Sequence, residues 1–263
     1  MSLPTSTKPN GLIHFLLIAI IFVAASSAVR PPCQHEYCDK QNSLLEWVEA
    51  NGGYVNPKVE LTKGPDPNWA IGGVFATDYI SRDEELFRLP PKLLLCGATF
   101  CDVVGSLSHE LSKGEESFWS PYLSVLQDHE IDLPRVWTKE ERDLFSGLYP
   151  SDIAMTEARE YCDIDLTDKT NLRALQLVLA RSAGDNYCMI PLHDSMNHAQ
   201  EGFENAQTHG VPYNDLLIGH NNDEYFTVAI DNIVKNQQLF DSFGYNAFQR
   251  LFQDYGFFSQ YPR

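Results

Sequence analysis

The segment MIPLHDSMNHAQ, from Met189 to Gln200, carries polar side chains directly after an apolar run. Its Asp194, Asn197 and His198 supply a carboxylate, an amide and an imidazole. Taken alone this is a weak signal, because a single histidine is more often a hydrogen-bonded structural residue than a catalytic one. The chain has no HExxH motif, which argues against a zinc hydrolase, and no GxSxG motif, which argues against the commonest serine hydrolases. The segment therefore needs a second one to make a site.

A second segment, LFDSFGYNAFQRLFQDYGFF from Leu239 to Phe258, is crowded with aromatic residues close to the last residue of the chain. We predict that Phe248, Phe252 and Phe257 are ordinary core residues, because aromatic side chains contribute large apolar surfaces to a core. The remaining aromatic residues of this segment are candidates for a site.

The composition limits the partners. The 263 residues are enough for one or two domains with a real core. Lys and Arg number 19 against 36 Asp and Glu, for a net charge of −17. Such an acidic surface repels phosphate backbones, which argues against nucleic-acid binding, and it tolerates or attracts a lysine-rich peptide.

The N-terminus has the pattern of a targeting signal. Lys8 precedes an apolar run from Leu12 to Ala28 that closes with small residues. This predicts a secretory signal peptide over residues 1–28 and entry into the secretory pathway, towards the ER or secretion. A retained signal anchor and a bipartite plastid signal are alternatives, and we expect no membrane contact beyond this segment. Residues 29–42, rich in Pro, Cys and charge, are predicted to be a linker.

Whether the cysteines form disulfides depends on the compartment. In an oxidising compartment six cysteines form up to three disulfides. Cys33 and Cys38 lie close enough in sequence for a local loop, and so do Cys96 and Cys101. A metal site has little support, because the spacings fit no standard zinc motif, and we predict none. The cysteines are Cys33, Cys38, Cys96, Cys101, Cys162 and Cys188.

The elements alternate between strand and helix signals. Ser43 and Glu46 form a capping-box pattern that predicts a helix ending near Gly52. The stretch 72–95 predicts two strands around a charged turn at 81–84, and 215–230 predicts a hairpin that turns at 221–223.

Between the strand regions, about 103–182, the pattern becomes helical. Leu172, Leu175 and Leu179 recur at helical spacing, and Arg181 falls in the last turn. Strands, a helical insert and strands again predict an α+β fold over residues 43–263, whose sheets come from both ends of the chain.

Several motifs in a fixed order resemble the SET-domain protein methyltransferases, and the subgroup of the Rubisco large-subunit lysine methyltransferase above all. They are GGVFATDYI, ARS, DSMNH, QQLFDSFG and DYGFF, and SFWSPYLSVLQ and LPRVWTKEERDLFSGL look like the helical insert of that subgroup. The resemblance covers about Leu44 to Phe258. It implies a SET-type β fold of short sheets with a C-terminal pseudoknot, in which the Asn-His segment and the C-terminal aromatic segment pass through one another.

The resemblance also implies an activity, the transfer of a methyl group from S-adenosylmethionine to a lysine side-chain amine of a protein substrate. Such a transfer depends on near-linear alignment at short distance. The amine must be neutral, and a narrow, partly dry channel favours its uncharged form.

The cofactor residues of the family match named positions of this chain. The glycine-rich turn matches residues 71–73 followed by Val74, with Gly73 kept and Ile71 in place of the first glycine. Arg181 matches an arginine that pairs with the cofactor carboxylate. Asn197 and His198 match the pair that holds the cofactor's amino group and adenine.

Two departures affect the activity that the resemblance implies. Tyr255 matches an aromatic residue that borders the lysine channel, but Phe243 occupies the position of the catalytic tyrosine and lacks its hydroxyl. Losing such a group costs about 3 kcal/mol, or roughly a hundredfold in rate. Tyr245 is a candidate substitute. Relatives also carry a helical substrate-binding domain after the YGF segment, and we expect no such domain here.

Three alternatives to an active lysine methyltransferase stay open. One is a catalytically weak or inactive SET module that acts in binding. Another keeps the fold but methylates a histidine. The last is a disulfide-stapled secreted binding protein, which takes account only of the signal and the cysteines.

Overall fold

A computed structural model of the chain describes residues 36–63, 72–127, 131, 133–144, 162–183, 187–210, 225–243, 251–252 and 255. Its contacts divide the chain into Met1–Pro31 and Pro32–Arg263, and all of the described residues belong to the second unit. The predicted signal segment, Ile71, the turn 221–223 and Tyr245 lie outside the described residues, as do Phe248 and Phe257.

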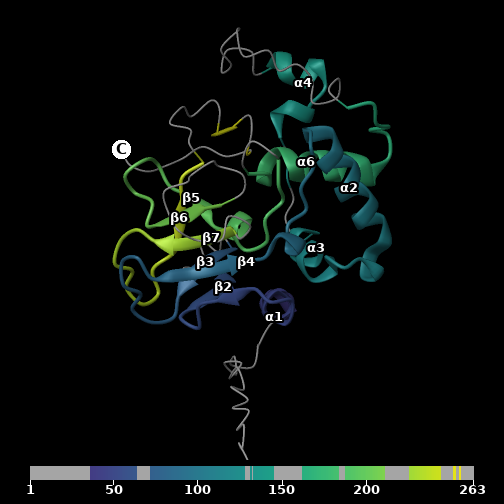
Figure 1. The fold of residues 1–263 in the computed structure, drawn as a ribbon. Coiled ribbons are helices and arrows are strands. Elements are labelled where there is room, and N and C mark those ends of the chain that lie inside the picture. Colours follow the sequence, from purple (N-terminus) through teal and green to yellow (C-terminus); the bar gives the residue numbers. More distant parts are fainter. Residues whose placement is uncertain are drawn as a thin grey trace, which may run out of the picture. The chain divides into compact units, whose positions relative to one another are not determined.

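Along the described chain a first helix precedes a group of short strands, a group of helices follows, and a second group of short strands comes last (Figure 1). The helices are α1 (Glu36–Ala50), α2 (Phe100–Lys113), α3 (Ser120–Gln127), α4 (Lys139–Leu144) and α6 (Lys169–Arg181), with short 3-10 turns η2 (Pro91–Leu93), η3 (Gly114–Glu116), η4 (Pro134–Val136) and η6 (His193–Ser195). The strands are β1 (Tyr54–Val55), β2 (Val59–Lys63), β3 (Gly72–Ala76), β4 (Glu85–Leu89), β5 (Asn197–His198), β6 (Ala206–His209), β7 (Tyr225–Ala229) and β8 (Phe240–Asp241).

The first helix is longer than the sequence pattern predicts. It begins at Glu36 rather than at Ser43, so residues 36–42 are helical and the linker prediction is wrong there. The reason is that Gln41 is buried on the same face as Leu44 and Val48, which extends the buried stripe before the predicted cap. The predicted end is confirmed, because the chain leaves the helix through Gly52 at φ +83°.

The strands form three separate pairings in the described part of the chain. A four-stranded antiparallel sheet has the order β1-β4-β7-β6, β2 pairs antiparallel with β3, and β5 pairs parallel with β8. The two strands predicted within 72–95 exist as β3 and β4, but they belong to different sheets. Of the hairpin predicted within 215–230, the second strand exists as β7. It pairs with β6, the strand that precedes it in the described chain.

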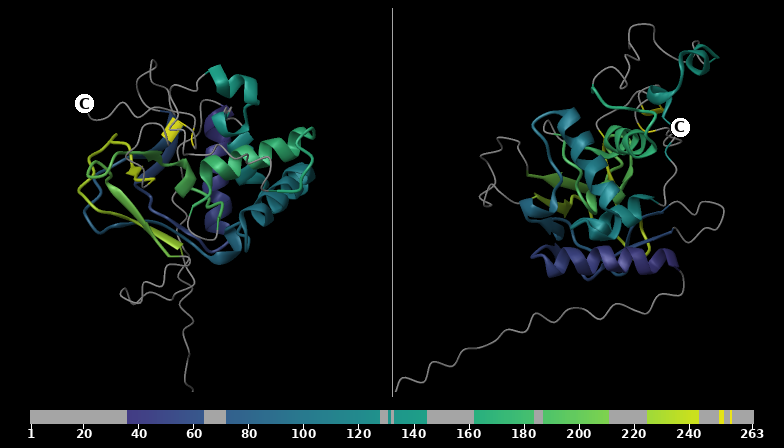
Figure 2. Two further views of the ribbon diagram at one scale, coloured as in Figure 1. Left: turned by 90° about the horizontal axis from the view of Figure 1, so that it is seen from above. Right: turned by 90° about the vertical axis from the view of Figure 1, so that its right-hand side faces the viewer.

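Within the predicted insert the described residues form α2, α3, α4 and α6, and the first of these helices begins at Phe100, slightly earlier than the predicted start. Thr99 caps α2 in a reciprocal capping box with Asp102, and Asp168 caps α6 by accepting from two backbone amides. Helices α2 and α6 pack together, and with α3 they gather on one side of the strands (Figures 1 and 2). Helix α1 lies against β1 and β2 and also contacts α3.

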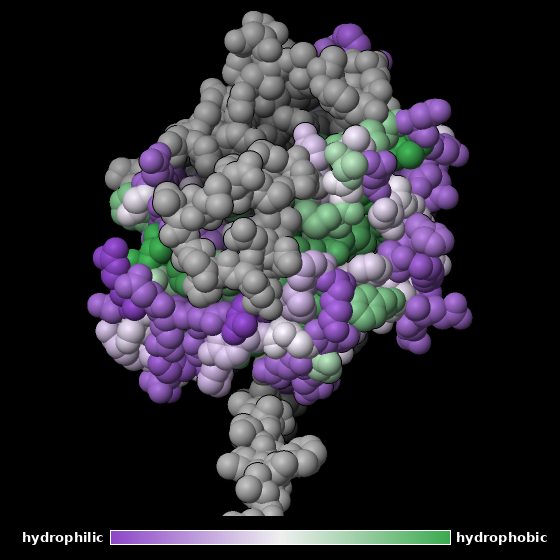
Figure 3. Space-filling model, viewed as in Figure 1, coloured by the Kyte–Doolittle hydropathy of each residue, from purple (hydrophilic) through white to green (hydrophobic). Residues whose placement is uncertain are grey.

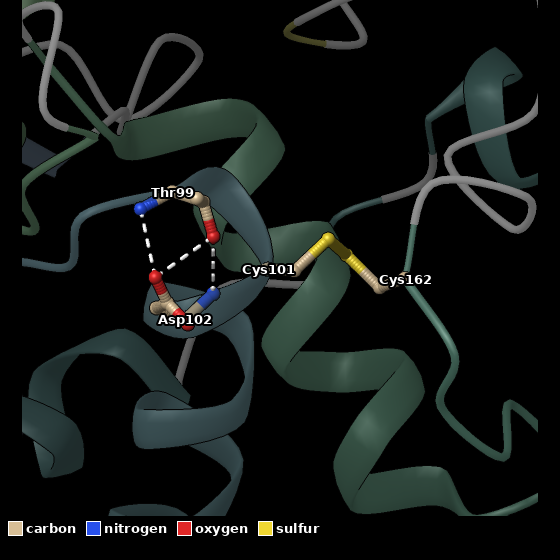
Figure 4. Close-up of a disulfide and its surroundings, with 4 residues drawn as sticks. All are labelled: Thr99, Cys101, Asp102 and Cys162. Atoms are coloured by element: carbon tan, nitrogen blue, oxygen red, sulfur yellow. Dashed lines mark hydrogen bonds between the residues drawn. A yellow bond between two sulfur atoms is a disulfide. The ribbon is translucent and has the colours of Figure 1, made fainter.

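Two disulfides fasten both ends of the insert. Cys96 pairs with Cys188, and Cys101 in the first turn of α2 pairs with Cys162 just before α6 (Figure 4). A local loop between Cys96 and Cys101 was therefore a wrong prediction, because the packing of α2 on α6 brings each cysteine to a distant partner. Cys38 is also disulfide-bonded. Cys33 lies outside the described residues.

One apolar core joins the sheets to the insert. Its members come from the four-stranded sheet, from β2 and β3, from α1, α2, α3 and α6, and from connecting segments. On the face seen in Figure 3, hydrophilic side chains cover much of the described surface at the lower and right-hand rims. Among the described residues, no helix has the length and hydrophobicity that a bilayer span requires. The largest buried side chains are Tyr122, Phe87, Leu44, Leu45, Ile80, Leu86, Leu89, Leu93, Leu107, Leu126, Leu133 and Leu175.

Candidate functional site

Three segments far apart in the sequence meet beside one another. In the parallel β5–β8 pair Asn197 lies opposite Phe240 and His198 opposite Asp241. Residues 236–239 also pair with β3, because the Leu239 amide donates to the Val74 carbonyl (2.8 Å). We call β3, β5, β8, the turn η6 and residues 236–239 the junction. It brings together the two segments that the sequence pattern singled out.

A buried asparagine stabilises the junction. Asn205 is 6% exposed, and its side-chain oxygen accepts from the Phe240 amide (2.8 Å) while its nitrogen donates to the Gln238 carbonyl (2.9 Å). Its own amide donates to the Phe240 carbonyl. One side chain therefore satisfies partly buried backbone groups in and just before β8, a two-residue strand that has few ladder bonds of its own.

Gly73 lies close to the ends of two side chains of the junction. A Cβ atom there would clash with Gln238 Nε2 and would lie 3.0 Å from Asn197 Nδ2. The Asn197 amide donates to the Gly72 carbonyl (3.0 Å), which ties β5 to β3. A larger residue at this position would therefore displace the side chain of Gln238 and crowd that of Asn197.

Aromatic rings pack against one another in tilted arrangements just after β8. The Phe243 ring lies between those of His198 (centroids 5.1 Å apart) and Tyr255 (4.7 Å). The Phe243 amide donates to His198 Nδ1 (3.1 Å), so this nitrogen carries no proton. Burial lowers the pKa of His198, although the Glu204 carboxylate opposes the effect, and the neutral ring that the hydrogen bond requires is favoured.

Arg181 is held at the junction through η6. Its Nη1 donates to the Asp194 carbonyl (2.6 Å), and the Asp194 carboxylate accepts from the Tyr122 hydroxyl of α3 (2.5 Å). Burial raises the pKa of Asp194 to about 6, and Arg181 and the bond from Tyr122 partly oppose this. The insert therefore contributes directly to the geometry of the site.

The backbone before η6 is strained. Leu192, fully buried, has a φ of +69°, a conformation that non-glycine residues rarely adopt. Such strain persists only where the surrounding packing holds it, and it is commoner at functional sites than elsewhere. Here the strained residue leads directly into His193 and Asp194.

Most of the predicted site residues come together. Asn197, His198, Phe243 and Tyr255 form one connected group, and Gly73 adjoins Asn197. Phe252, predicted to be a core residue, is half-buried with its ring against that of Trp137.

Val74 does not belong to this group. Its side chain is fully buried in the apolar core, and its carbonyl accepts from Leu239. Burial of the side chain does not test binding through the backbone, so the assignment of Val74 to the cofactor stays a prediction. In the described part of the chain, no three His, Cys, Asp or Glu side chains gather as a metal site requires.

Sequence patterns missed three residues of the site. Tyr122 lies within the SFWSPYLSVLQ stretch of the insert and Asn205 lies outside the quoted motifs, and neither position signals its tertiary contact with the site. Gln238 kept the register of the QQLFDSFG motif, which was a signal of its importance.

The chain is similar in sequence to known proteins. No family model matches the chain. Over 266 residues it is 27% identical to an N-lysine methyltransferase setd6 of Salmo salar, covering 86% of this chain and 59% of that protein. The N-lysine methyltransferase setd6 of Danio rerio is 26% identical over 297 residues, 90% of this chain and 61% of its own length. The chain thus spans about three fifths of these relatives.

Solved structures resemble the fold. A crystal structure of the SET domain of LSMT bound to lysine and AdoHcy superposes with a TM-score of 0.59 at 18% identity. A structure of Rubisco LSMT bound to AdoMet gives 0.60 at 17% identity. Each superposition covers 84% of this chain and 57% of the solved chain.

Proposed function

We propose that this chain, which folds as a SET domain, transfers a methyl group from S-adenosylmethionine to the side-chain amine of a lysine in a protein substrate. One observation carries the proposal: the parallel pairing of β5 with β8 brings Asn197 and His198 close to Phe243, whose ring contacts that of Tyr255. These residues belong to motifs that are expected to build one pocket. The relatives named N-lysine methyltransferase support the acceptor.

The polar atoms at the junction fit the amino-acid part of such a cofactor. Arg181 Nε and Gln238 Nε2 are buried and have no hydrogen-bond partner among the described residues. A buried donor without a partner is costly, and a bound carboxylate would remove that cost. We therefore assign Arg181 to the carboxylate of the ligand, with Asn197 and His198 beside it.

The chain's own residues would prepare the acceptor. When bound, S-adenosylmethionine supplies an electrophilic methyl group on a sulfonium. The rings of Phe243 and Tyr255 exclude water, which favours the neutral lysine amine that can accept the methyl group. The Asp194 carbonyl, already fixed by Arg181, is an electron-rich group of the kind that contacts a polarised methyl.

A second candidate function rests on Phe243. A SET module that binds the cofactor or a partner but transfers methyl groups slowly would need no hydroxyl at this position. Calorimetry with S-adenosylmethionine tests binding, and transfer of labelled methyl groups from the cofactor to a protein extract tests activity. Binding without transfer would favour the second candidate.

Two variants refine this test. Asn197→Ala is expected to weaken cofactor affinity, and unchanged affinity would show the site assignment to be wrong. Phe243→Tyr restores the hydroxyl, and an increase in turnover of about a hundredfold is expected if that group is what the native chain lacks. The acceptor is identified from the labelled residue, which separates lysine from histidine.

Entry into the secretory pathway is part of the proposal. Disulfides persist in oxidising compartments, and the described cysteines are all bonded. The acidic net charge of −17 suits a lysine-rich protein substrate. Imaging a tagged full-length chain tests the compartment, and exclusive localisation to the cytosol would contradict this part.

A further inference from the structure

A buried polar cluster joins the four-stranded sheet to the β5–β8 pair. His193 of η6, Thr208 of β6, Thr227 of β7 and Asp241 of β8 form it, with the ring of Tyr225 against that of His193 (5.6 Å). Thr227 is fully buried and Asp241 is 8% exposed. His193 and Thr208 are partly buried, so the cluster runs from the interior towards the site.

The hydrogen bonds within the cluster have a fixed direction. Thr208 Oγ1 lies 3.0 Å from His193 Nδ1, 3.0 Å from Thr227 Oγ1 and 3.2 Å from Asp241 Oδ2. A hydroxyl has one proton, and the carboxylate can only accept it, so Thr208 donates to Asp241 and accepts from the other two. Burial lowers the pKa of His193 to about 4, so its ring is neutral and its proton must be on Nδ1.

The carboxylate of this cluster is expensive to bury. Burial raises the pKa of Asp241 to about 6, although hydrogen bonds from the Ser242 amide and from Thr208 oppose this. The Glu204 carboxylate raises this pKa further and His209 lowers it. Apolar residues of similar size commonly replace buried polar groups without loss of stability. A role other than stability is therefore needed to explain the cluster.

The position of the cluster suggests that role. Asp241 lies opposite His198 in the β5–β8 pair and two residues before Phe243. The Ala199 amide donates to the Asp241 carbonyl (2.9 Å). His193 belongs to the turn that leads to Asn197. Both segments of the site are thereby attached to β6 and β7 through the cluster.

We propose that His193, Thr208 and Asp241 are positioning residues whose hydrogen bonds fix the register of β5 against β8 and so hold His198 against Phe243. This inference rests on the proposed function only where its test measures binding of the cofactor. A two-residue parallel pairing has few ladder bonds to set its register, and a directional side-chain cluster supplies what is missing.

The main variant combines His193→Leu with Asp241→Leu, and Asp241→Asn is a milder second variant. Asp231→Asn is the matched control, because Asp231 also accepts a 2.7 Å bond from the next amide but is exposed. Thermal unfolding, hydrogen exchange of the Ala199 and Phe243 amides, and calorimetry with S-adenosylmethionine are measured for each.

The double leucine variant is expected to unfold at or above the native temperature. The exchange of the two amides should nevertheless be about tenfold faster, and cofactor affinity about tenfold weaker, as for other groups that orient a ligand residue indirectly. Asp241→Asn should change in the same direction, and the control should match the native chain.

Unchanged amide exchange in a folded variant would overturn the proposal. A uniform rise in exchange with a lower unfolding temperature, or failure of both variants to fold, would also overturn it, because the cluster would then serve stability alone. If the native chain binds no S-adenosylmethionine, the proposed function fails while amide exchange still decides the positioning role.

Discussion

The helical insert and the junction are stabilised in different ways. Helices α2 and α6 pack through fully buried apolar side chains such as Val104 and Leu175, and two disulfides fasten their ends. The junction consists of very short strands held by Asn205, Asn197 and other buried polar groups. The insert owes its stability to burial and covalent links, and the junction owes its shape to directional bonds.

Buried carboxyl groups show the same difference. In the insert, desolvation raises the pKa of Glu110, but hydrogen bonds from Lys113 and Ser117 outweigh it and the net pKa is lowered. At the junction, burial dominates and the pKa values of Asp194 and Asp241 rise to about 6. In the insert, hydrogen bonds stabilise the charged form of the buried carboxyl group. At the junction, the geometry of the site requires buried carboxyl groups whose charged form costs stability.

The largest expected effect comes from opening the disulfides. A bridge that closes a loop of 61 residues contributes about 4 kcal/mol, so replacing Cys101 and Cys162 by serine should lower the free energy of unfolding by that order. Protection of amides in α2 and α6 should fall more than that of Ala76 and Leu239. Equal losses in both regions of the chain would remove the contrast between the insert and the junction.

The next largest effect is expected from removing the side chain of Asn205, which binds backbone groups of the junction. Asn205→Ala leaves the partly buried Phe240 amide and Gln238 carbonyl without this partner, at a cost of about 3 kcal/mol. Chemical denaturation measures it. Asn232→Ala is the control, because exposed Asn232 also accepts from a backbone amide, of Arg82, that water can satisfy instead. A similar loss in the two variants would contradict the assigned role.

Stability should depend on pH with opposite sign in the two regions. The raised pKa of Asp194 means that its contribution to stability is present below its usual pKa of 3.8 and lost as the pH rises through about 6. As the pH rises through this window, the free energy of unfolding of Asp194→Asn should therefore increase by about 3 kcal/mol relative to that of the native chain.

The insert supplies the opposite case. Since the pKa of Glu110 is lowered, its contribution is present above its usual pKa of 4.5 and lost as the pH falls through its folded value. Glu110→Gln should lose stability relative to the native chain as the pH rises. Urea denaturation over the acid and neutral range measures both variants, and parallel profiles would be the contrary result.

The smallest effect is expected at the start of the insert. Thr99→Ala removes the cap of α2 and its reciprocal bonds with Asp102 (Figure 4), which should cost about 1 kcal/mol. Thr99→Ser keeps the hydroxyl and should restore most of the loss. Thermal unfolding measures the pair, and no difference between the two would show that the cap is not used.

Local patterns predicted the insert and the chemistry-bearing motifs better than the connections between them. Leucine spacing and Arg181 placed α6 because helical contacts are local in sequence. The start of α1 and the pairing of Cys96 were missed because each depends on a partner distant in the chain. Val74 was assigned to the site by its place in a motif, but its side chain faces the core.

The order of the amino acids was enough to specify the helical insert, the residue types of the site and the missing hydroxyl at Phe243. It took the folded chain to establish that His198 lies against Phe243, that Tyr122 reaches Asp194, and that Asp241 meets His193. Two-residue strands have no pattern of their own, so their register is set by side chains contributed from elsewhere in the fold.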